Sequence, residues 1–170
     1  MNKIYLAGGC FWCIGDYLSS FHGIKEVISG YSGGEEKDIT YKDVKEQKTG
    51  HRETVEVIFD ELEISKEEII DIYLSYVDPF DKDGQFIDKG HSYTLAMYYT
   101  SIEEKTLFET KLEAFQKQVE KGIYIAVEPF KFFIKAEEYH QNFGQKNQDK
   151  LYEELKAGGR VCHLALFKNK

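Results

Sequence analysis

The sequence predicts an α+β protein, a single-domain two-layer α/β sandwich in which helices pack against one sheet. Predicted strands and helices alternate along the 170 residues, and 42% of the residues are hydrophobic, enough for one core of ordinary size. Neither proline, Pro79 or Pro129, lies in a Pro-rich or Gly/Ser-rich stretch that would mark a linker. We therefore expect residues 1–170 to form one domain, with a mobile C-terminal tail from about residue 157.

The N-terminal part is predicted as a strand, a glycine turn, a helix and a second strand. Lys3–Ala7 forms the first strand and ends at two glycines. Val27–Gly30 forms the second, and a polar loop then extends to about Gly50. The helix between the strands is indicated by apolar side chains at three- and four-residue spacing: Cys13, Ile14, Tyr17, Leu18 and Phe21. Cys10 stands where this helix begins.

The middle of the chain contains two strands and a helix. A capping box at Ser65–Glu68 opens the helix, and Asp78–Pro79 ends it. The polar loop Asp81–His91 then leads to a strand over Tyr93–Tyr99. The other strand, His51–Asp60, alternates with period two and puts five residues on one face: His51, Glu53, Val55, Val57 and Phe59.

The C-terminal part continues the alternation. A strand is predicted over Ile123–Val127, a short helix over Ala136–Gly144, and an irregular tail from Gly158. A second capping box, Ser101–Glu104, opens a long helix whose buried side carries Leu107, Phe108, Leu112, Phe115 and Val119.

Charge and composition exclude several classes of function. A net charge of −8 disfavours binding to nucleic acid or to an anionic membrane surface. The apolar stretch within Met1–Ala7 is too short for a signal peptide, and no later segment has the length of a membrane span. Three cysteines in a chain of this size do not form a secreted disulfide framework. We therefore expect a cytoplasmic protein.

Cys10 is the strongest candidate nucleophile. The reactive form of cysteine is the thiolate, and the start of a helix lowers the pKa of a thiol. The preceding glycines, Gly8 and Gly9, allow a sharp turn that leaves the sulfur approachable. The alternative is a small buried apolar cysteine.

Cys13 forms a Cys-x-x-Cys pair with Cys10, a spacing that allows a disulfide on the first turn of a helix. Core packing is the alternative role for Cys13. A zinc site would need further ligands, and Cys162-His163 lacks the second closely spaced pair that such sites use. We expect no bound metal.

Glu53 and the aromatic pair Phe11-Trp12 complete the candidate site. Glu53 lies on the apolar face of its strand, where burial would raise the pKa of the carboxyl and make it a proton donor; alternatively, it is solvated at the end of the strand. Consecutive helical residues cannot both point inward, so Phe11 or Trp12 should line a pocket suited to a methyl or thioether group. The residues alone leave five others unranked: Tyr41, Asp88, Tyr93, His91 and His140.

An ordered set of motifs lies between about residues 4 and 147: Gly9–Trp12, Gly30–Gly34, Thr40-Tyr41, Thr49–Val55, Asp88 with Tyr93 five residues on, Pro129-Phe130 and Glu138–Gln141. This set resembles the A-type peptide methionine sulfoxide reductases. The resemblance implies a ferredoxin-like fold and an enzyme that reduces methionine S-sulfoxide, free or in proteins, as antioxidant repair.

The resemblance also implies a mechanism without a bound cofactor. The substrate methyl lies against Phe11 and Trp12, and Cys10 attacks the sulfur to leave methionine and a sulfenic acid. A second cysteine then forms a disulfide, which thioredoxin reduces. The sulfoxide oxygen takes hydrogen bonds from Glu53, Tyr41 and Tyr93, and Glu53 is also its proton donor. Asp88 supports the pocket.

The sequence departs from the common family pattern around the second cysteine. Many members have glycine at the position of Cys13, glutamate at that of Gly15, and two cysteines in a tail that here has only Cys162. Cys13 is the preferred resolving residue because its disulfide needs no loop closure; Cys162, or a relay through both, is the alternative. A general dithiol–disulfide oxidoreductase and a metal-binding module remain competing hypotheses.

Overall fold

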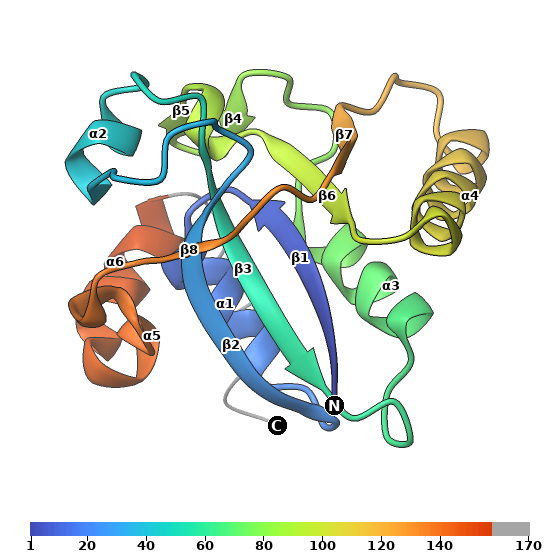
Figure 1. Ribbon diagram of the computed structural model, residues 1–170, viewed down its shortest axis with the longest axis horizontal. Coiled ribbons are helices and arrows are strands. Elements are labelled where there is room, and N and C mark those ends of the chain that lie inside the picture. The colour runs from blue at the N-terminus through green and yellow to red at the C-terminus, as the bar shows by residue number, and fades with distance from the viewer. Residues whose placement is uncertain (158–170) are drawn as a thin grey trace.

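The computed structural model describes residues 1–157, and its centre is a six-stranded sheet (Figure 1). Strands β6 and β7 run parallel, and the other neighbouring pairs run antiparallel. Across the sheet the order is β7 (Ile125–Pro129), β6 (Leu95–Tyr99), β1 (Asn2–Gly8), β3 (Arg52–Phe59), β2 (Ile24–Ser32) and β8 (Ile134–Lys135). The first strand of the chain therefore lies inside the sheet, and its C-terminal end delivers Cys10 to the interior.

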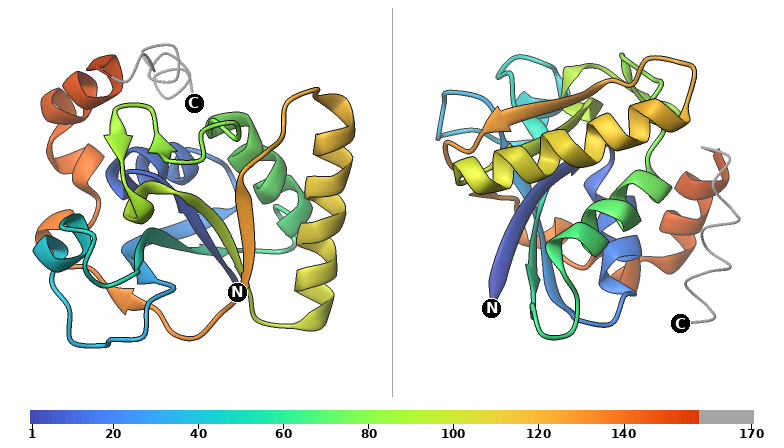
Figure 2. Two further views of the ribbon diagram at one scale, coloured as in Figure 1. Left: turned by 90° about the horizontal axis from the view of Figure 1, so that it is seen from above. Right: turned by 90° about the vertical axis from the view of Figure 1, so that its right-hand side faces the viewer.

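Helices cover one face of this sheet. The right-hand view of Figure 2 shows α1, α3 and the C-terminal helices on the same side of β1 and β3. Their apolar side chains form the main core with that face, including Leu6, Val55, Leu18 and Tyr73. This arrangement confirms the two-layer α/β sandwich; the narrower ferredoxin-like label stays a prediction. The helices are α1 (Phe11–Ser19), α2 (Tyr41–Lys45), α3 (Lys66–Tyr76), α4 (Ile102–Gln118), α5 (Phe143–Lys146) and α6 (Gln148–Ala157).

The other face of the sheet has a smaller, more polar cover. Tyr5 and Tyr98 are buried there, and the ring of Tyr5 stacks on Phe130 with 4.2 Å between centroids. The Tyr5 hydroxyl donates to Glu56 at 2.7 Å. The chain between β7 and β8 thus closes this side of the sheet over a set of hydrogen-bonded polar groups.

Some predicted elements need correction. The loop expected up to Gly50 contains α2, whose N-cap Thr40 forms a capping box with Asp43. The helix expected over Ala136–Gly144 is instead a 3-10 turn, η2 (Glu138–His140), followed by α5. Tyr93, expected to start a strand, lies in a second 3-10 turn, η1 (His91–Tyr93), before β6.

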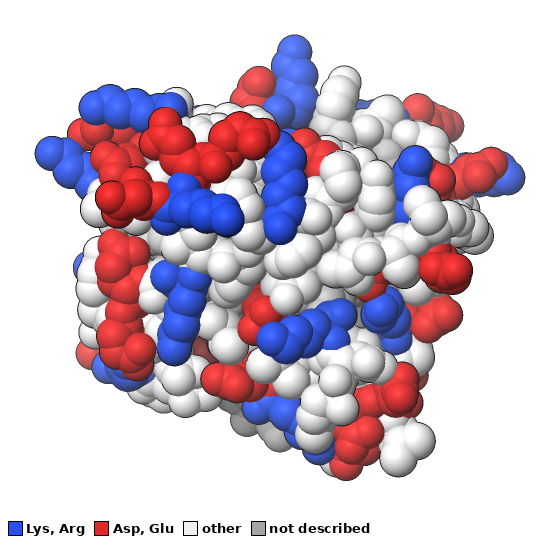
Figure 3. All heavy atoms as spheres, in the orientation of Figure 1, with Lys and Arg blue, Asp and Glu red and all other residues white. Residues whose placement is uncertain are grey.

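Two further features concern the ends and the surface of the protein. The predicted tail falls outside the described residues. Within residues 1–157, no helix combines the length and apolar character needed to cross a bilayer. Figure 3 shows basic and acidic side chains interspersed on the face viewed, without a continuous basic area there.

Candidate active site

Cys10 lies at the junction of β1 and α1. Gly9 adopts a left-handed φ of 82°, and a Cβ there would come within 2.7 Å of the Cβ of Gln85, so this turn requires glycine. Cys10 is the N-cap residue of α1, and its carbonyl accepts the amides of Cys13 at 3.2 Å and Ile14 at 3.3 Å. The predicted position of Cys10 at a strand-to-helix turn is therefore confirmed.

Cys10 and Cys13 are both reduced thiols and both buried. They are close enough for their sulfurs to hydrogen-bond, and this contact, followed by burial, raises the pKa of Cys10 well above its ordinary value. We expected the helix start to lower the pKa of Cys10; the pair and its desolvation outweigh that effect. In the reduced protein Cys10 therefore holds its proton to higher pH than an ordinary cysteine.

Glu53 is 2% exposed, which excludes a solvated position at the end of its strand. One carboxyl oxygen, Oε1, accepts the backbone amide of Phe11 at 3.3 Å. Burial first, and then the repulsion between the ionised forms of Glu53 and Cys10, raise the pKa of Glu53 well above its ordinary value, although hydrogen bonds from Phe11 and the Tyr93 side chain oppose the shift. A buried carboxyl beside a nucleophile, with its proton retained, is suited to general acid catalysis.

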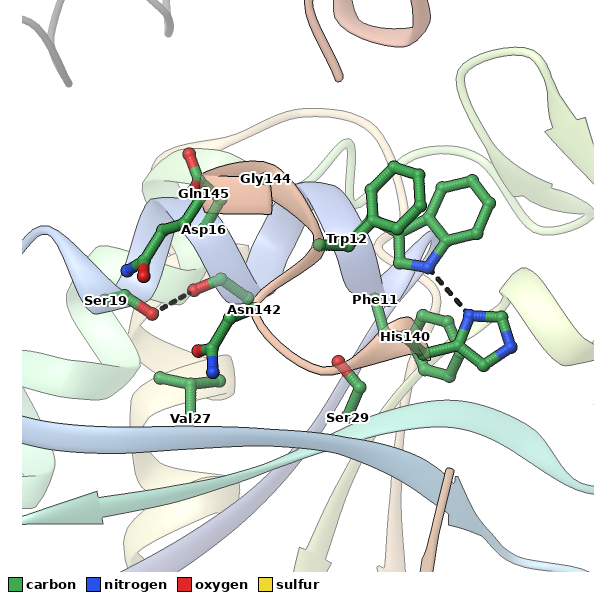
Figure 4. Close-up of a pocket in the computed structure, with 12 residues that line it drawn as sticks. Phe11, Trp12, Asp16, Ser19, Val27, Ser29, His140, Asn142, Gly144 and Gln145 are labelled. Carbon is green, nitrogen blue, oxygen red and sulfur yellow. Dashed lines mark hydrogen bonds between the residues drawn. The ribbon is translucent and has the colours of Figure 1, made fainter. Parts of the chain in front are cut away.

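The aromatic pair divides between core and pocket, as its helical spacing predicts. Phe11 is almost fully buried, whereas Trp12 is half-buried and stacks on Phe143 with 3.9 Å between ring centroids. The Trp12 Nε1 donates to Nδ1 of His140 at 2.9 Å, a bond visible in Figure 4. The indole is thus held on both its face and its edge.

Tyr41, Tyr93 and Asp88 come from three separate segments. Tyr41 begins α2, Tyr93 lies in η1, and Asp88 lies in β5 (Asp88–Lys89), which forms a small hairpin with β4 (Gly84–Gln85). Burial is the main cause that raises the pKa of each tyrosine hydroxyl, and the charges of Glu53, Asp88 and Cys10 raise it further. These groups therefore share one electrostatic environment around the nucleophile.

Sequence reasoning missed the part of the site that comes from the C-terminal segment. His140, one of the five residues that the sequence left unranked, is fully buried and packs against Tyr41 with 4.4 Å between ring centroids. Glu137 accepts the Tyr31 hydroxyl at 2.9 Å and the Tyr41 amide at 3.1 Å. The segment Glu138–Gln141 was recognised as a motif, but no pattern in it indicated these contacts.

A small pocket of about 10 Å³ lies behind the aromatic pair, between α1 and the chain that follows His140 (Figure 4). Its lining includes Asp16, whose pKa burial raises, and Ser29 and Asn142. Among residues 1–157, no group of three or more His, Cys, Asp or Glu side chains is arranged to hold a metal ion. Cys162, the other candidate resolving residue, lies outside the described residues.

A thiol pair at a helix start, a buried acid and an aromatic wall together define a thiol oxidoreductase. The family model described as peptide methionine sulfoxide reductase matches residues 2–165. The chain is 42% identical over 168 residues to peptide methionine sulfoxide reductase MsrA 2 of Staphylococcus aureus strain Mu50, covering 96% of this chain and 95% of that protein. It is 39% identical over 171 residues to MsrA 1 of Lactococcus lactis, covering 99% and 93%.

The fold is similar to a solved structure as well. Mxr1 of Saccharomyces cerevisiae in its reduced form superposes with a TM-score of 0.83 at 30% identity, over 87% of this chain and 86% of that one. The chain belongs to the peptide methionine sulfoxide reductase family.

Proposed function

We propose that this protein is a peptide-methionine (S)-S-oxide reductase, with Cys10 as the nucleophile and Glu53 as the proton donor. The bond between Glu53 Oε1 and the Phe11 amide carries the proposal, because it holds a buried acid directly beside the residue that follows the nucleophile. The family and its named relatives support the same activity.

In the first step, the Cys10 sulfur attacks the sulfoxide sulfur while Glu53 delivers its proton to the sulfoxide oxygen. Methionine leaves, the oxygen stays on Cys10 as a sulfenic acid, and the thiol proton of Cys10 replaces the proton that Glu53 gave. Tyr41 and Tyr93 donate hydrogen bonds to the oxygen, with Asp88 supporting the pocket. Phe11 and Trp12 contact the substrate methyl group.

In the second step, the Cys13 thiol attacks the sulfenic sulfur and releases water, which leaves a Cys10–Cys13 disulfide. The contact between the two thiols favours Cys13 over Cys162 for this role. Mxr1, to which the chain is 30% identical, has been solved in complex with Trx2. We propose a thioredoxin-type dithiol protein as the reductant and the cytoplasm as the location. The substrates are free methionine sulfoxide and oxidised proteins, so the enzyme serves protein repair.

The proposal is tested by turnover of the two methionine sulfoxide epimers with a dithiol reductant. We expect turnover of the S epimer by the wild type and none by Cys10→Ser. Failure of the wild type on the S epimer, or full turnover by Cys10→Ser, would contradict the proposal.

A further inference from the structure

Glu53 and Tyr93, both proposed to contact the sulfoxide oxygen, each have a sequence neighbour, and these two neighbours are hydrogen-bonded to each other. Arg52 precedes Glu53, and Thr94 follows Tyr93. The Arg52 Nε donates to Thr94 Oγ1 at 2.8 Å. Because successive side chains of a strand point to opposite faces, Arg52 lies on the face of β3 opposite to Glu53.

This side-chain bond lies where the sheet itself cannot connect the two catalytic segments. Strands β3 and β6 are not neighbours, since β1 lies between them. The pairing of β1 reaches only Val55 on β3 and Leu95 on β6, because the chain then turns through Gly9 into Cys10. Beyond that point no backbone ladder sets the distance between Glu53 and Tyr93.

Arg52 is itself held in one position. It is 7% exposed, its Nη1 donates to the Tyr98 hydroxyl at 3.1 Å, and the same nitrogen pairs with Glu128. Thr94 is held as well, because its hydroxyl donates to the carbonyl of His91 at 2.6 Å. A planar guanidinium fixed by two other partners, Tyr98 and Glu128, can hold the hydroxyl of Thr94 at one place.

We propose that Arg52 is a positioning residue for sulfoxide reduction: through Thr94 it sets the placement of Tyr93 relative to Glu53 across the gap that β1 leaves. This inference rests on the proposed function. Arg52 touches neither substrate nor reacting atoms, so its loss should act on the chemical step and not on substrate binding.

The experiment measures kcat and KM for methionine S-sulfoxide in the wild type, in four single variants and in one double variant. Thr94→Val keeps the shape of the side chain but removes both the acceptor for Arg52 and the donor to the His91 carbonyl, and Thr94→Ser restores a hydroxyl. Arg52→Met removes the donor. Glu128→Gln is the matched control, because it removes the charge of the ion pair while keeping an acceptor for Arg52 Nη1 and leaving the bond to Thr94. Thermal unfolding midpoints are measured for every variant.

We expect Thr94→Val to lower kcat by about tenfold or more with little change in KM, since small misplacements of catalytic groups have effects of that order. Thr94→Ser should recover most of the loss, and Glu128→Gln should stay near the wild type. The double variant Arg52→Met/Thr94→Val should be no slower than the slower single one, because both remove the same bond.

Wild-type kcat in Thr94→Val would overturn the positioning role, as would multiplied losses in the double variant. A kcat loss in Glu128→Gln that follows its unfolding midpoint would also overturn it, since it would indicate a general effect of stability. If Arg52→Met does not fold, the Thr94 pair decides the question. An inactive wild type would instead overturn the proposed function, so the two failures are distinguishable.

Discussion

Glu53 is bound to the backbone amide of Phe11 at 3.3 Å, so the candidate acid is fixed to the first residue of α1. The nucleophile is the N-cap of that same helix. One hydrogen bond therefore fixes the position of the start of α1 relative to β3. Movement of the helix start would carry Cys10 and the partner of Glu53 together.

Replacing the acid should remove most of the reductase activity. Glu53→Gln keeps an oxygen that can accept from Phe11 but has no acidic proton, so we expect kcat to fall by about 10²–10⁴-fold. Steady-state turnover of methionine S-sulfoxide measures the loss. Glu56→Gln is the control, because Glu56 lies on the same strand and is buried on the other face against Tyr5.

The same pair of variants separates the two enzymatic hypotheses. A general dithiol–disulfide oxidoreductase would need only the thiol pair, so nearly intact turnover in Glu53→Gln would support it and contradict the sulfoxide mechanism. Equal losses in Glu53→Gln and Glu56→Gln would point to a general effect on the fold.

Stability should depend on pH through Glu53. Because burial raises the pKa of Glu53 in the folded state, the folded chain binds more protons than the unfolded chain from the ordinary value of 4.5 upwards to the raised pKa. This group therefore makes the free energy of unfolding fall as pH rises through that window. Glu53→Gln should flatten the slope, as measured by urea unfolding at a series of pH values. An unchanged slope would show that the carboxyl is ionised when folded.

The resolving cysteine is tested by trapping. In Cys13→Ser, we expect one methionine per enzyme in a single turnover but loss of sustained turnover, because the sulfenic acid of Cys10 has lost its neighbouring thiol. Mass spectrometry of the oxidised protein should show Cys10 as a sulfenic acid in this variant and a Cys10–Cys13 disulfide in Cys162→Ser. Sustained turnover in Cys13→Ser, with loss in Cys162→Ser, would assign the role to Cys162.

Trp12 should stabilise the folded protein through the hydrogen bond that its indole N–H donates to His140. Trp12→Phe removes the donor to His140 Nδ1, which leaves a buried acceptor unsatisfied at a cost of about 1–3 kcal/mol. Urea unfolding followed by circular dichroism measures the change. Phe143→Leu is the comparison, because it removes the stacked ring and keeps the Trp12 hydrogen bond. No loss of stability in Trp12→Phe would contradict the assigned contact.

The sequence predicted the elements whose signals are local and long. The capping boxes at Ser65 and Ser101 mark the starts of α3 and α4, and the alternation over His51–Asp60 marks β3. Short elements were missed because β8 and α5 span too few residues to show a period. Strand order was not predictable either, because it depends on contacts between distant segments.

The candidate site divides in the same way. Cys10 and Glu53 were predictable from a glycine turn and from a carboxylate on an apolar face, both of which are local patterns. The buried position of His140 depends on rings supplied by Trp12, Tyr41 and Tyr139, which only the folded chain brings together. The sequence predicted a lowered pKa for Cys10, and the structure shows a raised one. The general rule for helix starts takes no account of the neighbouring Cys13 thiol or of burial.

The unequal burial of the two thiols has a consequence for how the enzyme is recycled. Cys10 is 8% exposed and Cys13 is fully enclosed. If these sulfurs form the disulfide, Cys10 is the less enclosed of the two residues, so we expect the mixed disulfide with the reductant to form on Cys10 and Cys13 to be the leaving thiol. The substrate and the reductant would then use the same entrance at different times, and a bound oxidised peptide would block recycling until it departs.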